Sequence, residues 1–160
     1  MKRMTQCFMM AACLFQMPAF ADAQRDPKEV VQEYFADLQS GKIAELMNLF
    51  SDDVVWHQPG NNFLSGTYVG KEALAKLFGQ FMQISAGSFK IDQVKSIMSN
   101  GNLVSATLHF SAHRCQYRNV EMSMDGVDLM KVVDGKIKEV YLFSEDQSKE
   151  DSFWGPNIEL

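Results

Sequence analysis

Residues 49–60 read LFSDDVVWHQPG, and the change from helical to strand periodicity falls within this stretch. Apolar residues recur at helical spacing over residues 43–50, and the polar residues 51–53 end that helix. Residues 54–58 are predicted to form a short strand, which Pro59-Gly60 stops. The stretch therefore predicts a helix that is followed directly by a strand.

Two further helices are predicted on either side of this stretch. The first begins at Asp26-Pro27, where Asp26 can cap the helix and Pro27 suits its first position, and it ends at Gly41. The other follows Gly70 and covers residues 71–84. An apolar stripe runs along each helix, at Val30, Val31, Tyr34, Phe35 and Leu38 in the first and at Leu74, Leu77, Phe78, Phe81 and Met82 in the other.

From Ser88 onward the apolar period changes to two, which is typical of strands. Strands are predicted over residues 89–98, 103–113, 120–133 and 136–143, with turn signals between the members of each pair and a bulge near Asp125-Gly126. Helices that precede a run of strands indicate the α+β class. We predict a curved antiparallel or mixed β-sheet, wrapped over three N-terminal helices and enclosing a conical cavity, as in an α+β barrel.

The first 23 residues resemble a secretory signal peptide rather than part of the fold. Lys2 and Arg3 precede a short uncharged apolar run, Pro18 ends the run, and small residues before residue 24 provide cleavage sites. We predict a signal peptide over residues 1–23, a single domain over residues 24–160, and a secreted or periplasmic location. A buried N-terminal helix and lipid attachment at Cys13 are the alternatives.

The composition is that of one ordinary globular domain. The chain has 160 residues, is 46% hydrophobic and carries a formal net charge of −5. The acidic balance disfavours a nucleic-acid or anionic membrane partner, so no nucleic acid and, after signal cleavage, no membrane is expected. Cleavage would leave one cysteine, Cys115, which excludes an internal disulfide and has no predicted role.

Three segments resemble the SnoaL-like branch of the nuclear-transport-factor-2-like superfamily: residues 49–60, LSGTYVGKE at residues 64–72, and DGKI at residues 134–137. Residues 146–147 and 151–154 are also similar to this branch. The superfamily includes ketosteroid isomerases, polyketide cyclases, dehydratases and binding proteins. The resemblance implies a cystatin-like roll over nearly the whole mature chain and a homodimer. It does not select a reaction, because this fold hosts many chemistries.

Asp128 is the most informative carboxylate in the sequence. By strand alternation it shares a face with Met130 and Val132, and a lone carboxyl on an apolar face is costly to ionise. Its pKa is therefore predicted to rise, which suits a general acid or a neutral hydrogen-bond donor. A strand bulge at Asp125-Gly126 and an ion pair between Asp128 and Lys138 are the alternatives.

The resemblance assigns catalytic roles to two residues. It gives Asp128 the position of the acidic oxyanion-hole residue of ketosteroid isomerases, and it gives Tyr34 the position of their oxyanion-hole tyrosine. Tyr34 can then donate to a developing enolate oxygen. From its spacing alone, Tyr34 also fits the apolar stripe of the first helix beside Phe35.

The catalytic base is where the sequence departs from the isomerase pattern. Isomerases carry a carboxylate before the proline of the first strand, and Gln58 occupies that position here. Because an amide cannot abstract a proton, the neighbouring His57 is the candidate base and pocket residue. Trp56 and Gln58 are candidates to orient a ligand. Alternation puts His57 and Gln58 on opposite faces, so both enter one pocket only if the strand bulges at Pro59.

The remaining candidate ligand contacts are apolar or aromatic, which suits a flat hydrophobic molecule and equally suits a filled core. They are Phe63, Tyr68, Phe78, Met82, Met122, Met130 and Phe143. His109 and His113 share a strand face but are about 13 Å apart, too far to bind one metal ion. No metal and no cofactor are predicted.

Two functions follow from these residues. The first is an acid–base enzyme of the isomerase, cyclase or dehydratase type that acts on a small hydrophobic carbonyl compound, with His57, Asp128 and Tyr34 as catalytic residues. The second is a binding protein that holds a small hydrophobic molecule without changing it. The amide at Gln58 favours the second.

Overall fold

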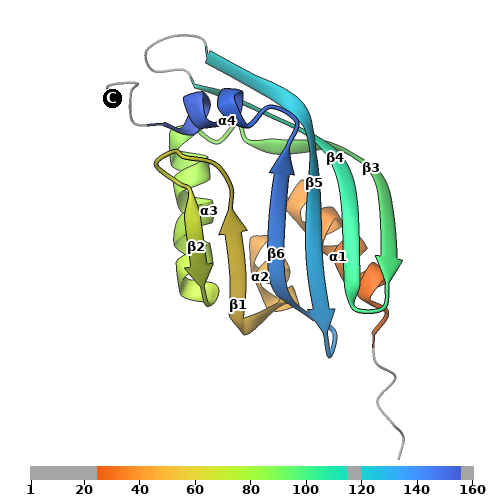
Figure 1. Ribbon diagram of the computed structural model, residues 1–160. Helices are drawn as coiled ribbons and strands as arrows, with labels where there is room; N and C mark the ends of the chain where they lie inside the picture. The colour runs from red at the N-terminus through yellow and green to blue at the C-terminus, as the bar shows by residue number, and fades with distance from the viewer. Residues whose placement is uncertain (1–24, 115–119, 156–160) are drawn as a thin grey trace, which may run out of the picture.

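The computed structural model describes residues 25–114 and 120–155, and it confirms the α+β class (Figure 1). The N-terminal half contains α1 (Pro27–Gln39), α2 (Ile43–Leu49), β1 (Phe50–Gln58), β2 (Gly66–Val69) and α3 (Lys71–Ile84). The C-terminal half contains β3 (Lys90–Asn100), β4 (Leu103–Arg114), β5 (Val120–Val133), β6 (Lys136–Ser144) and α4 (Gln147–Trp154). The predicted signal peptide and Cys115 lie outside the described residues.

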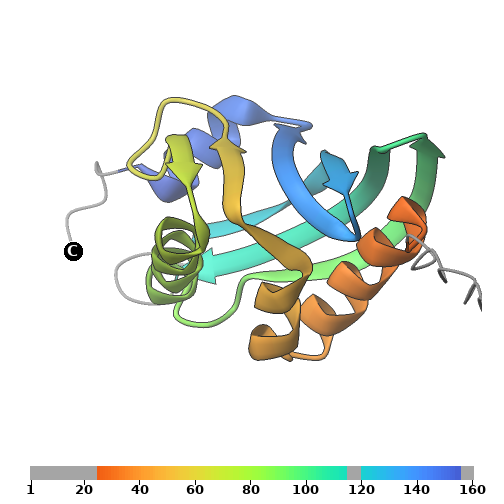
Figure 2. The ribbon, with the colours of Figure 1, turned by 90° about the horizontal axis from the view of Figure 1, so that it is seen from below.

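One six-stranded sheet runs through the domain in the order β2-β1-β6-β5-β4-β3. Its neighbouring strands are antiparallel except for β1 and β6, which pair in parallel. The mixed sheet is curved, as predicted, and Figure 2 shows α3 on one side and α1 with α2 on the other, with strands spanning the space between them. Among the described residues, no helix is long and apolar enough to cross a membrane.

The helices begin and end for local reasons that the sequence anticipates. Pro27 opens α1, and the Asp26 carboxylate accepts a hydrogen bond of 2.9 Å from the Lys28 backbone N–H. Such a cap satisfies one of the donors left free at a helix start. Gly70 precedes α3 with a φ of 86°, a conformation that glycine adopts readily.

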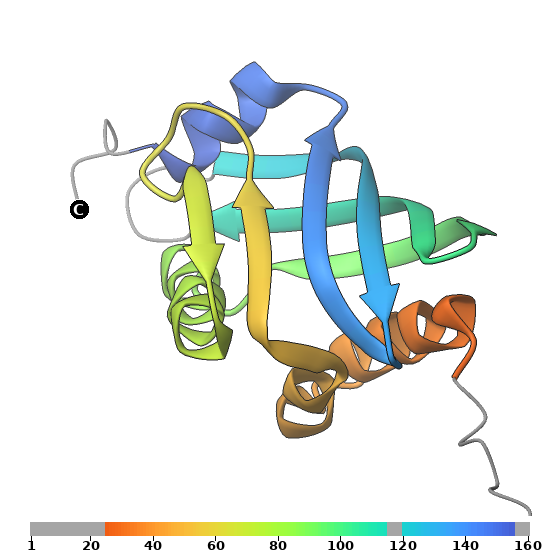
Figure 3. The same cartoon turned by 60° about the horizontal axis from the view of Figure 1, so that its bottom comes forward.

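Two elements were not predicted from the sequence. β2 has only four residues and its exposure does not alternate, so it lacks the pattern of a half-buried strand. α4 has eight residues and begins at Asp146, whose side chain accepts from the Lys149 backbone N–H. α4 lies across one end of the sheet, close to the loop between β1 and β2 (Figure 3). The Asp151 side chain joins them by accepting from the Asn61 backbone N–H at 3.0 Å.

The predicted bulge at Asp125-Gly126 is absent from the pairing of β4 with β5, whose register is continuous through both residues. Gly126 instead makes room for an aromatic ring, since a Cβ atom there would lie 3.1 Å from Cε1 of Phe110. The register of β5 shifts elsewhere, against β6 between Lys131 and Val132. Because β5 stays regular up to this point, Asp128 keeps the inward orientation that alternation predicts.

Candidate active site

A cavity of about 120 Å³ opens between the concave face of the sheet and the helices. Most of its wall is apolar, and its polar side chains are Tyr34, Gln58, Asp128, Ser144 and Glu150, with the indoles of Trp56 and Trp154. An apolar cavity of roughly 150 Å³ can hold a benzene ring. At about 120 Å³ the cavity is close to this size, and its wall chemistry suits a small single-ring hydrophobic molecule that carries one or two polar atoms.

The mouth of the cavity lies between helices. Two of its lining residues are also well exposed to solvent: Ile43 on α2 is 50% exposed, and Met82 on α3 is 46% exposed. Leu38 on α1 lines the same side and is half-buried. The cavity wall is therefore exposed to solvent on this helical side.

Asp128 is placed in the cavity by the regular alternation of β5. It lies opposite Ala106 of β4 and Leu142 of β6. Burial, and secondarily the Glu150 carboxylate, raises the pKa of Asp128 from 3.8 to about 7. Among the described residues, none donates a hydrogen bond that holds the Asp128 carboxyl in its charged form. A carboxyl of this kind has a proton affinity suited to acid–base chemistry near neutral pH.

Tyr34 reaches the same cavity from α1. Its side chain is 3% exposed and contacts Phe35 and Phe50 edge-on, with ring centroids 4.9 Å and 5.7 Å away. Burial, followed by the charge of Asp128, holds the pKa of Tyr34 well above its ordinary value of 10. The phenol therefore stays protonated at neutral pH and is available as a donor to a ligand.

Glu150 supplies a second buried carboxylate from α4. Its Oε1 atom accepts from Trp154 Nε1 at 3.2 Å and from Gln58 Nε2 at 3.3 Å. Its Oε2 atom accepts from Gln147 Nε2 at 3.1 Å and from the Ser144 hydroxyl. Burial raises the pKa of Glu150, while these donors favour its charged form and act against that rise.

Comparison with known proteins agrees with this architecture. The model of the SnoaL-like domain family matches residues 31–140. The chain belongs to the SnoaL-like domain family. The match confirms the resemblance seen in the sequence, and it extends from α1 to β6, which includes Tyr34 and Asp128.

This SnoaL-like domain also resembles several solved structures. A Xanthomonas campestris protein of unknown function with a cystatin-like fold is 40% identical, with 82% of this chain and 99% of that chain covered and a TM-score of 0.77. A nuclear-transport-factor-2-like protein from Burkholderia xenovorans LB400 is 20% identical, with 81% and 95% covered and a TM-score of 0.66. A proposed polyketide cyclase from Pseudomonas putida KT2440 is 16% identical, with 82% and 99% covered and a TM-score of 0.63.

The last two likenesses show the fold alone. A search of curated proteins finds no match.

The structure places His57 away from the cavity of the SnoaL-like domain, which corrects the prediction that it is a pocket residue. β1 does not bulge at Pro59, so Trp56 and Gln58 face inward and His57 faces the opposite side of the sheet. There His57 stacks on Tyr141 with ring centroids 4.2 Å apart, and its Nε2 atom lies 3.2 Å from the Glu139 carboxylate. Tyr34 and Asp128 line the cavity together without it.

The predicted ligand contacts divide in the same way. Trp56, Gln58, Phe78 and Met82 line the cavity. Phe63 and Phe143 do not line it and are 61% and 57% exposed, because Phe63 lies in the loop after β1 and Phe143 points outward from β6.

Three more of the predicted ligand contacts do not line the cavity either. Tyr68 donates to the Leu64 carbonyl at 2.9 Å instead of reaching the cavity. Met122 and Met130 are fully buried in the core, and Met122 lies about 20 Å along β5 from Asp128.

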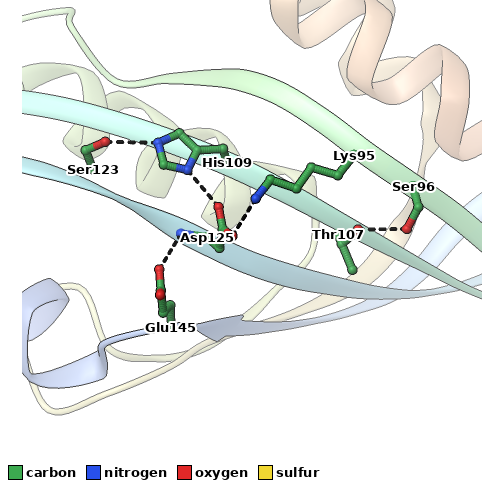
Figure 4. Close-up of polar contacts among 7 residues, drawn as sticks. All are labelled: Lys95, Ser96, Thr107, His109, Ser123, Asp125 and Glu145. Carbon is green, nitrogen blue, oxygen red and sulfur yellow. Dashed lines mark hydrogen bonds and ion pairs between the residues drawn. The ribbon is translucent and has the colours of Figure 1, made fainter.

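The predicted alternative for Asp128, an ion pair with Lys138, is not formed, since Lys138 binds Asp53 at 2.7 Å. His109 lies on the outer face of the sheet, where its ring contacts Asp125 at 2.7 Å and Ser123 at 2.9 Å (Figure 4). Lys95 also pairs with Asp125 there, so His109 belongs to a surface network. Among the residues described, no three His, Cys, Asp or Glu side chains form a metal site.

Sequence reasoning missed Glu150, Ser144 and Trp154 as cavity residues. All three belong to the C-terminal segment that follows β5, and α4 was not predicted. One signal was present, because residues 146–147 and 151–154 were recognised as similar to the SnoaL-like branch. Glu150 lies between these two segments.

Proposed function

We propose that this SnoaL-like domain is an acid–base enzyme that acts on a small hydrophobic carbonyl compound. One observation carries the proposal: the Asp128 carboxyl, which no described donor stabilises, lines the same mainly apolar cavity as the Tyr34 phenol and acts on its pKa. The likeness in fold to a proposed polyketide cyclase supports it.

The two residues divide the chemistry between them. The Tyr34 hydroxyl donates to the carbonyl oxygen, which stabilises the negative charge that develops when a neighbouring carbon loses a proton. Asp128 accepts that proton in its ionised form and returns it to another atom of the substrate. A pKa of about 7 leaves both forms of Asp128 populated at neutral pH. Isomerisation, cyclisation and dehydration all share this proton-transfer step.

Hydrogen–deuterium exchange tests the proposal without the natural substrate. The probe is acetophenone, a neutral single-ring ketone whose methyl hydrogens exchange with D₂O when a base forms the enolate. We expect the protein to accelerate this exchange, measured by mass spectrometry, and the rate to rise with pH up to about 7 and then level off, as ionised Asp128 becomes available. Asp128→Asn is expected to slow exchange by about 10²-fold or more, and Tyr34→Phe by about 10²-fold.

His57→Ala is the matched control, because His57 lies on the outer face of the sheet. We expect it to exchange the probe at the wild-type rate. Exchange that persists in Asp128→Asn, or that disappears in His57→Ala, contradicts the proposed roles. Both variants are compared by circular dichroism so that a folding defect is recognised.

A binding protein for a small hydrophobic molecule is the second candidate. It is favoured by Gln58, since an amide occupies the place of the isomerase carboxylate and its donor group is already bound to Glu150. In that case acetophenone binds, Tyr34→Phe weakens binding, and no exchange above that of the buffer is detected.

A further inference from the structure

We infer that Glu150 is a fixed buried anion that makes the cavity select neutral carbonyl compounds over carboxylates of the same shape. This inference rests on the proposed function, because it defines which ligand the same cavity accepts. Glu150 acts through its charge on the cavity and on Asp128, so it is a positioning and specificity residue rather than a catalytic one.

The hydrogen-bond network fixes Glu150 as an acceptor. Trp154 Nε1 can only donate. Gln58 Oε1 accepts from Trp56 Nε1 at 3.1 Å, which turns the Gln58 amide nitrogen toward Glu150. The Trp154 and Gln58 nitrogens can therefore only donate, and Glu150 Oε1 accepts both N–H groups.

The other oxygen of Glu150 is held in a similar way. Gln147 Nε2 lies 3.1 Å from Glu150 Oε2 and 3.0 Å from Asp151 Oδ1, so the amide nitrogen faces two carboxylates and must donate. The Ser144 hydroxyl is the fourth donor. A carboxylate has about four acceptor positions, and this network occupies them, so Glu150 has little capacity left to take a proton from a ligand.

No cation neutralises this charge within the described part of the chain. Glu150 forms no ion pair with a described Lys, Arg or His side chain, and the buried Arg114 instead donates to the Phe153 carbonyl at 2.8 Å. The charges that act on Glu150 and on the neighbouring carboxyl of the cavity are themselves carboxylates: Asp151 from α4 raises the pKa of Glu150, and Glu150 raises that of Asp128 from β5. These groups are negative when ionised, so they add to the charge of Glu150 and do not neutralise it.

This arrangement discriminates between ligands by charge. An anionic ligand in the cavity would meet a like charge in surroundings of low polarity, where repulsion is strong. A neutral carbonyl compound meets no such repulsion and still receives the Tyr34 hydrogen bond. The same charge also raises the proton affinity of Asp128, which strengthens it as a base.

The test compares acetophenone with benzoate, single-ring molecules that differ mainly in a methyl group against a charged oxygen. Dissociation constants are measured at pH 6 by isothermal titration calorimetry for wild type, Glu150→Gln and Glu121→Gln. We expect wild type to bind the ketone at least about tenfold more tightly than benzoate, and Glu150→Gln to bind benzoate at least about tenfold more tightly than wild type does. The dissociation constant of the ketone is expected to differ by less than about threefold between Glu150→Gln and wild type.

Glu121→Gln is the control, because it removes one exposed carboxylate from the same strand as Asp128. It is expected to leave both constants unchanged. Glu150→Gln keeps an oxygen that accepts from Trp154 and Gln58. If it fails to fold, wild type still tests the inference, since equal or tighter binding of benzoate by wild type overturns it.

The outcomes separate this inference from the proposal on which it rests. Binding of neither probe contradicts the proposed function. Binding of both probes with no preference contradicts only the role of Glu150. A preference for the ketone that Glu150→Gln leaves unchanged also overturns the role of Glu150, because another feature of the cavity then sets the preference.

Discussion

Asp128→Asn is expected to raise the free energy of unfolding at pH 8 by up to about 4 kcal/mol, at roughly 1.4 kcal/mol for each unit of pKa change. The pKa of Asp128 is about 7 in the folded protein against an ordinary 3.8. Between pH 3.8 and about 7, Asp128 therefore keeps its proton in the folded state and has lost it in the unfolded state. The contribution of Asp128 to the free energy of unfolding of the wild-type protein is fully present below about pH 4 and is lost as the pH rises through about 7.

Urea unfolding at several pH values between 4 and 8 measures this effect. The difference between Asp128→Asn and wild type should grow with pH and level off above about 7, because asparagine carries no titrating proton. Asp125→Asn is the matched control on the outer face of the same strand. The pKa of Asp125 is lowered, chiefly by its hydrogen bond from Lys95. Replacing the Asp125 carboxylate is therefore not expected to raise the free energy of unfolding at pH 8. A pH-independent difference for Asp128→Asn would contradict its protonation in the folded state.

Trp154→Ala is expected to lower the free energy of unfolding by about 3–5 kcal/mol. Trp154 is 1% exposed, and its ring centroid lies 4.6 Å from that of Phe153 and 5.0 Å from that of Phe81. Truncation would leave a hole where α4 meets α3 and would remove one donor to Glu150. Equilibrium unfolding in urea at pH 7 measures the loss.

Trp154→Phe separates the two contributions. It keeps a smaller aromatic ring in the same place but removes the indole N–H, so we expect a smaller loss of about 1–3 kcal/mol from the donor and the reduced ring volume together. Phe63→Ala removes an aromatic ring that is 61% exposed and should cost less than about 0.5 kcal/mol. An equal effect of Trp154→Ala and Trp154→Phe would show that ring packing contributes little.

The sequence predicts the fold well where the apolar pattern is strong. α3 was expected over residues 71–84 and has those bounds, because an apolar stripe and Gly70 define it together. Asp128 was correctly placed on an inward-facing strand position, since β5 alternates regularly around it. Both features depend on local periodicity, which the sequence contains in full.

The candidate site was only partly predictable, for two physical reasons. His57 was expected in the pocket if β1 bulged at Pro59, and neighbours in space decide whether a strand bulges. Here β1 is held between β2 and β6, and His57 is opposite Thr67 and Tyr141 in the register. Glu150 was missed because α4 is short and its position depends on side-chain contacts with residues far away in the sequence, such as Gln58.

The parallel pairing of β1 with β6 has a consequence for how the chain folds. β1 is made before α3, β3, β4 and β5, but its neighbour in the sheet, residues 136–144, is synthesised only after all of them. Until then β1 and β2 can form only a two-stranded ribbon, which is marginally stable in water. Closing so long a loop carries an entropic cost that slows folding. The domain must therefore complete its sheet after synthesis has reached β6, with β1 and β6 available at once.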